Sequence, residues 1–359
     1  MPTTPFPPIF DGHNDTLLNL YQKGRGRDRS FFKKSDIGHI DLPRAREGGL
    51  AGGFFAIFIP NKAGDFPYID PTQGIGGGLT YDIPLPPALT QKYAARQTNA
   101  MIALLLQLVE QSQGAMQVVH TGAELAACLQ NGTLAAIMHI EGVAALDTNL
   151  DALYVLHAAG LRSLGPVWSR PNKFGEGVPF SFPGQPDIGG GLTEAGIVLV
   201  RTCNHLKIMI DLSHLNEKGF WDVARLTDAP LVATHSNAHA LCHAPRNLTD
   251  KQLDAIGESG GVVGVNYHVG FLREDGNERA ETSLNEIVRH VRYIADRIGI
   301  EHVALGSDFD GAKMPDDLVD VTGLPRLMAA FQEAGFDEAA LAKIAYQNWL
   351  RVLGKTWGG

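Results

Sequence analysis

Three histidines and two carboxylates in this sequence stand at the ends of short apolar runs: His13, Asp15, Glu141, His214 and His235. Imidazole nitrogens and carboxylate oxygens are donors that suit zinc and related divalent metals. A single zinc ion needs only about three or four ligands, so five donors fit two ions when one carboxylate is shared between them. Glu141 is the candidate for the shared ligand because it lies between the others in the order of the chain.

The spacing of these residues predicts two groups of ligands. His13 and Asp15 are two positions apart at the end of a strand-like run, so their side chains lie on one face and can reach the same metal. His214 and His235 would complete a second site. A lone histidine after a strand is more often structural than a ligand; the carboxylates at other strand ends favour these three as ligands. The histidines expected to be structural are His139, His157, His239, His243 and His290.

Two further residues are candidates for catalysis and for substrate binding. Asp308 follows an apolar run directly, where a carboxylate outside the metal shell could take a proton from water and pass it to a leaving amine. Asp310 is the alternative, as a base or as a helix cap. Arg246 carries a planar guanidinium suited to a substrate carboxylate, and the alternative is a surface ion pair.

The elements that must position these residues form a repeated pattern of strand and helix. Apolar runs without polar alternation predict strands buried on both faces, as in a parallel sheet. There are eight of them, at residues 8–13, 53–59, 134–141, 161–168, 207–214, 230–235, 261–267 and 302–308. Helical periodicity lies between most of them, at residues 92–111, 151–158, 194–204, 249–256 and 283–298.

Eight such units predict an α/β fold, the closed (β/α)8 TIM barrel, and a doubly wound open sheet is the alternative. Catalytic residues in this barrel come from the C-terminal ends of several strands, which is where the five donors and Asp308 lie. No linker or change of composition divides the chain. Residues 1–359 are therefore predicted to form a single metal-dependent hydrolase domain, with an insertion near residues 64–87 after the second strand.

Composition narrows the classes of partner. The 359 residues are 44% hydrophobic and carry a net charge of −9, without a basic run that would attract nucleic acid. No apolar run reaches membrane-spanning length and the N-terminus has no secretory pattern, so we expect a cytoplasmic protein without a membrane partner. The three cysteines are scattered and predict no disulfide framework. A symmetric homodimer is the default expectation for a soluble enzyme.

Taken together, these motifs resemble the membrane (renal) dipeptidases of the amidohydrolase superfamily, over essentially the whole chain. The matching stretches are Asp-Gly-His13-Asn-Asp15, Ile-Glu141-Gly, Asp-Leu-Ser-His214, Thr-His235-Ser, Arg246-Asn-Leu-Thr-Asp, Gly-Ser-Asp308-Phe-Asp310-Gly and Asn348-Trp-Leu-Arg-Val. A His-x-Asp on the first strand paired with a glutamate on the third distinguishes this family from relatives that use His-x-His and a carboxylated lysine.

The resemblance implies a binuclear centre of two Zn2+ ions at the C-terminal ends of the strands. His13, Asp15 and Glu141 would hold one ion, and Glu141, His214 and His235 the other. It also implies that a metal-bridging hydroxide attacks the amide of a small dipeptide and that Asp308 acts as the acid and base. Arg246 would bind the C-terminal carboxylate of the dipeptide, and a D-residue is often accepted at that position.

One position departs from the family pattern. Where a histidine usually ends the fourth strand, this chain has Trp168, whose indole offers a donor and no basic nitrogen. Either the metals together with Arg170, Asn172 or Lys173 stabilise the oxyanion, or the substrate is not a plain dipeptide. The Gly- and Pro-rich loop at residues 174–192 is expected to shape the substrate site, with a passive surface loop as the alternative.

The sequence leaves three candidate functions. The first is zinc-dependent hydrolysis of dipeptides. The second is hydrolysis of another small amide, such as an N-acyl amino acid or a cyclic amide, which the loss of the strand-four histidine favours. The third is a metal-binding relative without catalysis, which the presence of every expected ligand and of Asp308 disfavours.

Overall fold

The computed structural model describes residues 5–61 and 80–358. Residues 64–79 of the predicted insertion therefore lie outside the described residues. The remainder of that insertion contains a short strand, β3 (Tyr81–Ile83), which pairs antiparallel with β7 (Phe180–Phe182). The sequence pattern did not predict this two-stranded ribbon.

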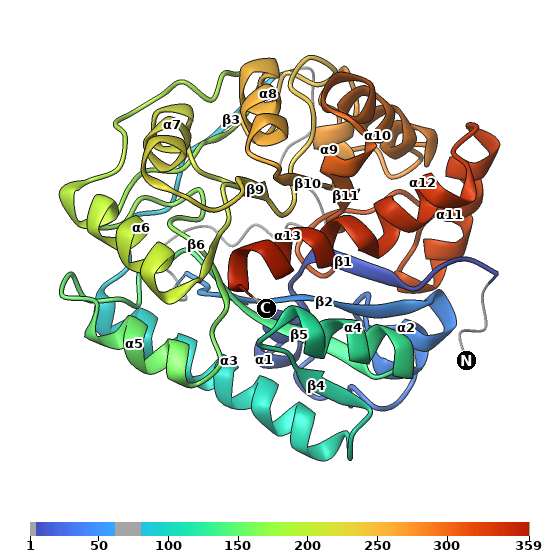
Figure 1. Ribbon diagram of the computed structural model, residues 1–359, viewed down its shortest axis with the longest axis horizontal. Helices are drawn as coiled ribbons and strands as arrows, with labels where there is room; N and C mark the ends of the chain where they lie inside the picture. The colour runs from blue at the N-terminus through green and yellow to red at the C-terminus, as the bar shows by residue number, and fades with distance from the viewer. Residues whose placement is uncertain (1–4, 62–79, 359) are drawn as a thin grey trace.

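Two parallel sheets form the centre of the molecule (Figure 1). Strand order in the first is β1-β2-β5-β6-β8, with β4 beside β5, and in the second it is β11-β10-β9. Each of the eight predicted runs overlaps one strand of these sheets, and β4 is an additional one. The bounds are β1 Ile9–Asn14, β2 Leu50–Phe58, β4 Met116–Val118, β5 Leu134–Glu141, β6 Ser163–Gly165, β8 Met209–Ile210, β9 Val232–Ala233, β10 Val262–Val265 and β11 Val303–Leu305.

Helices cover the outer faces of these sheets (Figure 1). Side-chain caps fix the starts of several: Thr121, Thr193 and Asn216 accept hydrogen bonds from backbone N–H groups at the first turns of α4, α6 and α7. All five predicted helical segments are helices. The bounds are α1 Thr16–Tyr21, α2 Leu42–Gly48, α3 Gln91–Gln111, α4 Gly122–Asn131, α5 Asp151–Ala158, α6 Glu194–Leu206, α7 Glu217–Leu226, α8 Asp250–Glu258, α9 Val269–Leu272, α10 Asn285–Ile298, α11 Leu324–Glu333, α12 Glu338–Ala342 and α13 Asn348–Trp357.

The α/β fold with a parallel sheet, predicted from the sequence, is thus confirmed. Its strands are buried on both faces, as their continuous apolar runs require. Side chains on one face join the large core between strands and helices, for example Ile9, Phe55 and Val263. Alternate side chains from both sheets join a second core with α13. Its members on strands are Phe10, Phe54, Ala135, Ile137, Met209, Val232, Val262 and Ala304.

Trp349 of α13 closes this second core. Its indole is fully buried, packs against Phe10 and Phe54 and donates a hydrogen bond to the Leu305 carbonyl at 3.0 Å. Figure 1 shows α13, in dark red, lying near the centre of the view among the strands. The space between the two sheets beside α13 is therefore filled by apolar side chains.

Backbone contacts join the outer strands of the two sheets. Parallel bridges connect Asn14 with Phe309 and Asp211 with Val232. The Asp308 N–H donates to the His13 carbonyl at 2.9 Å. Within the second sheet, Gly264 of β10 makes close packing beside β9 possible, because a Cβ at this position would collide with the Thr234 carbonyl. Within the part of the chain described, no helix is long and apolar enough to cross a membrane.

Candidate metal centre

The predicted ligands come from four strands and meet at the C-terminal edge of the sheets. Glu141 is the last residue of β5 and shares the inward face with Ala135 and Ile137, because side chains alternate along a strand. His13 lies in β1 and Asp15 follows its end. His214 and His235 come shortly after β8 and β9.

Glu141 is shared between two groups of side chains. Its Oε2 lies 3.7 Å from His13 Nε2, which is itself 3.6 Å from Asp15 Oδ2. Its Oε1 lies 3.0 Å from His214 Nε2 and 3.6 Å from His235 Nε2. The ligand atoms of each group lie within 4.8 Å of one another. The structure thus brings together all five residues, with one carboxylate oxygen facing each group.

Hydroxyl groups orient two of the histidines. Ser169 Oγ lies 2.9 Å from His214 Nδ1, and Thr234 Oγ1 lies 2.8 Å from His235 Nδ1. These contacts leave both Nε2 atoms facing Glu141, only 3.1 Å apart. Burial lowers the pKa of both imidazoles well below the usual value, so both are neutral, which metal ligation requires. Hydrogen bonds to the second ring nitrogen are typical of histidines that bind metals.

The donor set fits divalent cations. His13 is fully buried, yet neither of its ring nitrogens has a hydrogen-bond partner among the described residues, and Asp15 Oδ1 also lacks one. Although burial lowers it, the carboxylates of Glu141 and Asp15 raise the pKa of His13 to about 10. Burial also raises the pKa of Glu141. The pocket therefore attracts positive charge, and a cation would satisfy these buried atoms.

A further possible group, His13, Asp211 and His235, is better explained as structural support. Asp211 accepts hydrogen bonds from the Thr234 N–H at 2.8 Å and the Thr234 hydroxyl at 2.6 Å. It also accepts one from the Ser213 N–H at 3.0 Å. These bonds fix the two histidine-bearing segments relative to each other.

The structure distinguishes between the two candidate bases. Asp308 lies beside the metal centre: its charge acts on His13 and Glu141, and its Oδ2 accepts a hydrogen bond from Asn266 Nδ2 at 2.8 Å. Asp310 Oδ1 accepts a hydrogen bond from the His39 N–H at 2.7 Å, and its Oδ2 has no hydrogen-bond partner among the described residues. Asp310 therefore holds the loop before α2, and it caps none of the described helices.

Arg246 is buried beside the same centre, so the alternative of a surface ion pair is wrong. It is 3% exposed, and its Nη2 donates to the His235 carbonyl at 3.1 Å. Its Nε and Nη1 have no hydrogen-bond partner within the described ranges. Burial lowers its pKa to about 10, so the guanidinium is still charged at neutral pH. A buried cation with two free donors is suited to an anionic group of a ligand.

Trp168 forms an aromatic wall with Phe58 and Phe180 at the Glu141 side of the centre. The Trp168 ring lies 5.1 Å from Phe58, 5.4 Å from Phe180 and 5.8 Å from His214, and all three aromatic residues are partly exposed. Phe58 pairs with Glu141 across the sheet. The wall therefore presents apolar surface next to two of the predicted ligands.

Three residues were candidates for stabilising the oxyanion, and two of them, Arg170 and Asn172, are hydrogen-bonded to other parts of the protein. Asn172 donates to the Pro166 carbonyl and accepts from the Phe174 N–H, both within its own loop, and Lys173 is exposed. Arg170 binds the Ile59 carbonyl and the Asn61 side chain through its two terminal nitrogens. Arg170 thus anchors the segment after β2.

Sequence reasoning missed the residues that support the ligands, namely Ser169, Thr234 and Asn266. Hydroxyl and amide residues are common, so only their position could have revealed them. Asn266 directly follows β10, at the same sheet edge as the ligands. The nearby His268 is 2% exposed, and its Nε2 lies 3.0 Å from Glu278 Oε1.

The comparison with protein families agrees with this geometry. The model described as "Membrane dipeptidase (Peptidase family M19)" matches residues 6–357. The chain belongs to the membrane dipeptidase family. The members of this family are metallopeptidases, and the chain is accordingly a metal-dependent dipeptidase.

Several relatives of this dipeptidase are similar over most of their length. A protein of Klebsiella pneumoniae, described as an uncharacterized protein in the pqqA 5' region, is 52% identical over 256 residues, 71% of this chain and 94% of the relative. Dipeptidase tcpJ of Claviceps purpurea is 28% identical over 96% of this chain and 76% of its own.

Among solved structures, a metallo peptidase of Rhodobacter sphaeroides superposes with a TM-score of 0.93 at 50% identity, covering 98% of this chain and 100% of its own. That crystal structure holds a phosphinate mimic of the dipeptide L-Ala-D-Ala.

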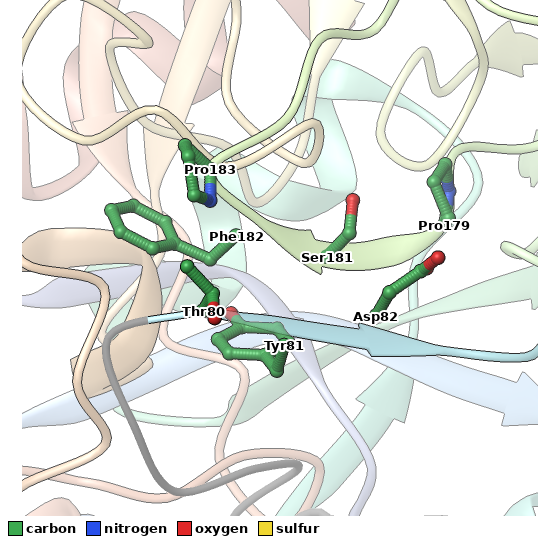
Figure 2. Close-up of a pocket in the computed structure, with 7 residues that line it drawn as sticks. All are labelled: Thr80, Tyr81, Asp82, Pro179, Ser181, Phe182 and Pro183. Carbon is green, nitrogen blue, oxygen red and sulfur yellow. The ribbon is translucent and has the colours of Figure 1, made fainter.

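A cavity of about 560 Å³ lies against the β3–β7 ribbon (Figure 2). Figure 2 shows Tyr81 and Phe182 close together on this ribbon, with Ser181 and Asp82 beside them. None of the predicted ligands lines it, so we assign it no part in the chemistry. The segment that leads into β7 nevertheless contacts the centre, because the Val178 N–H donates to the His214 carbonyl at 2.8 Å.

Proposed function

We propose that this chain is a zinc-dependent dipeptidase with two metal ions per chain. His13, Asp15 and Glu141 would hold one ion, and Glu141, His214 and His235 the other. The observation that carries this proposal is the position of Glu141, with one carboxylate oxygen toward each group of donors. Nitrogen and oxygen donors without thiolates are typical of catalytic zinc sites.

Residues of the chain would bind the substrate and move the proton. Arg246 would bind the free carboxylate of a dipeptide through the donors left without partners. Asp308 would accept a proton from the attacking water and donate it to the leaving amine. Bound divalent ions would supply Lewis acidity and lower the pKa of that water. The Trp168 wall and the loop at residues 174–192 would contact substrate side chains, since Phe180 of that loop lies beside His214.

A dipeptide with a D-residue at its C-terminal position is included in the proposed substrate class. The support is the Rhodobacter sphaeroides relative, which binds a mimic of L-Ala-D-Ala and is 50% identical to this chain. The second candidate is a different small amide, such as an N-acyl amino acid or a cyclic amide. The partly exposed Trp168 favours it, because an aromatic ring next to His214 supplies apolar surface in place of a basic side chain.

We further propose that the eight strands close into a complete (β/α)8 barrel. Two observations support it: a shared inner core of both sheets, and parallel bridges at both junctions between them. In this arrangement each ligand lies at the C-terminal mouth, and residues 1–359 act as a single domain.

The experiment that tests the function is a hydrolysis assay on protein whose zinc content is measured by elemental analysis. The substrates are dipeptides with L- and D-residues at the second position, N-acyl amino acids and C-terminal amides of the same dipeptides. We expect two zinc ions per chain and hydrolysis of dipeptides with a free carboxylate. Hydrolysis of N-acyl amino acids alone would move the assignment to the second candidate. A fully loaded protein inactive on all substrates would refute both.

A further inference from the structure

A buried asparagine that is not among the predicted site residues contacts the candidate acid and base. Asn266 follows β10, is fully buried, and its Nδ2 donates to Asp308 Oδ2 at 2.8 Å. The two residues are 42 positions apart in the chain, so the contact exists only because β10 and β11 pair side by side. No other hydrogen bond to the Asp308 carboxylate is found within the described residues.

The orientation of the Asn266 amide is fixed by its other contacts. Its Oδ1 accepts a hydrogen bond from the His268 N–H at 2.6 Å, so its Nδ2 is the group that must face Asp308. A flipped amide would place two oxygens against each other at Asp308 and two N–H groups against each other at His268. The His268 N–H therefore determines that the Asn266 amide turns its N–H group toward Asp308.

A second asparagine holds the backbone at this position. Asn237 is also fully buried; its Oδ1 accepts from the Asn266 N–H at 3.0 Å, and its Nδ2 donates to the Asn266 carbonyl at 3.1 Å. The segment after β9 thus binds both backbone groups of Asn266. Such a closed set of bonds leaves the side chain of Asn266 little freedom.

The remaining oxygen of Asp308 faces the metal centre. A Cβ on Gly311 would collide with both Asp308 Oδ1 and Asp15 Oδ2. The two carboxylates therefore lie side by side in the space that this glycine leaves open. Because Asn266 occupies Oδ2 as a donor, Oδ1 is the oxygen free to exchange a proton. The backbone of Asp308 has a φ of 62°, and this conformation sets the direction in which the side chain leaves the backbone.

We propose that Asn266 is a positioning residue that holds Asp308 by Oδ2 and presents Oδ1 for proton transfer. This inference rests on the proposed acid–base role of Asp308. Replacement of Asn266 by Ala would release the carboxylate to rotate, and a misplaced proton donor reduces turnover by on the order of 10²-fold. Because Asn266 does not contact the substrate or the metals in this scheme, KM and zinc content should change little.

The test is a double-mutant cycle on the zinc-loaded enzyme with N266A, D308N and the double variant. If Asn266 acts through Asp308, N266A lowers kcat in the native background and has no further effect in the D308N background. An equal loss in both backgrounds would overturn the proposal. If D308N alone did not lower kcat, the proposed role of Asp308 would be refuted instead, so the two failures are distinguishable.

Two more variants keep the test decisive if turnover of D308N is too low to measure. N266D retains the acceptor for the His268 N–H and replaces the donor by an acceptor toward Asp308, so we expect it to lose at least as much kcat as N266A. N348A removes a buried asparagine that binds the Ile300 and Val303 carbonyls, before and at the start of β11, whereas Asp308 follows the end of that strand. We expect N348A to lower the Tm and leave kcat unchanged. Near-native kcat in N266D, or equal kcat losses in N266A and N348A, would overturn the proposal.

Discussion

At the scale of single residues, burial and pairing decide which groups can act. Asp308 and Asp310 are two positions apart, and both have a positive φ. Asp308 lies beside Asp15 and accepts a hydrogen bond from Asn266, whereas one oxygen of Asp310 accepts a hydrogen bond from the backbone of His39. Asp308 therefore stays the predicted residue for proton transfer, and Asp310 binds the backbone of the loop before α2.

Asp308→Asn tests the first of these roles. Asparagine tolerates a positive φ and keeps an oxygen for Asn266, so the fold and the zinc content should remain. We expect kcat to fall by about 10²- to 10⁴-fold, the usual contribution of a general acid or base. Steady-state kinetics with zinc analysis checks this prediction. Turnover near that of the native enzyme would remove Asp308 from the mechanism.

Arg246→Ala tests the recognition of the substrate carboxylate. Removing the buried guanidinium should raise KM for dipeptides with a free C-terminus by about tenfold or more, as expected for loss of a charge-assisted hydrogen bond. For the C-terminal amides of the same dipeptides KM should change much less. The comparison of the two substrate series is the measurement. Equal effects on both would show that Arg246 does not contact the carboxylate.

At the scale of the elements, the paired strands need small residues where they approach most closely. Gly264→Ala should lower the free energy of unfolding by about 1–3 kcal/mol, because the new methyl group meets the Thr234 carbonyl and the Trp349 ring. Denaturant unfolding measures the loss. Gly190→Ala is the matched control, since nothing lies within 4 Å of a Cβ there. Equal stabilities of the two variants would contradict the tight contact between β9 and β10.

A buried histidine ties α10 to the loop after β9 and makes stability depend on pH. His290 Nε2 lies 2.9 Å from the Leu272 carbonyl, and its Nδ1 accepts from the Ala238 N–H at 3.1 Å, an arrangement that only a neutral ring satisfies. Burial lowers its pKa to about 3, whereas the unfolded chain has the ordinary value of 6.5. Below pH 6.5 the unfolded state binds a proton that the folded state does not.

This contribution of His290 to stability is therefore complete above pH 6.5 and decreases as the pH falls toward 3. We expect the free energy of unfolding to decline more steeply between pH 7 and pH 4.5 in the native protein than in His290→Gln, which has no titrating group there. Urea unfolding at several pH values provides the slopes. Parallel slopes would mean that His290 is protonated in the folded state.

At the scale of the whole molecule, the metal centre connects strands from both sheets, so metal binding should stabilise the fold. Removal of zinc with a chelator should lower the Tm, and added zinc should restore it. A free ion at 100 times its Kd contributes about 2.7 kcal/mol for one site. Calorimetry at known free zinc concentrations is the measurement, with His214→Ala as a control that should respond less. A Tm independent of zinc would contradict a centre shared by the two sheets.

The cytoplasmic location and the homodimer stay predictions.

Much of this architecture was determined locally. The apolar runs of β2 and β5 and the helical periodicity of α3, α5 and α6 are properties of short segments, so the alternating fold was predictable from the sequence. The ligands were predictable for a similar reason: parallel strands bring their carboxyl ends to one edge, and His13, Glu141 and His235 stand at such ends. The two-stranded ribbon of β3 and β7 was missed because its strands are short and far apart in sequence.

Only the tertiary structure decided what each side chain at that edge faces. The type of residue cannot show that Arg246 is buried with two unpaired donors, or that Asp310 binds the backbone of His39 while Asp308 binds Asn266. These distinctions depend on pairing between segments up to hundreds of residues apart. A side chain's chemistry is fixed by the sequence, whereas its solvation, its partners and its orientation are fixed by neighbours that only the folded chain brings within hydrogen-bond distance.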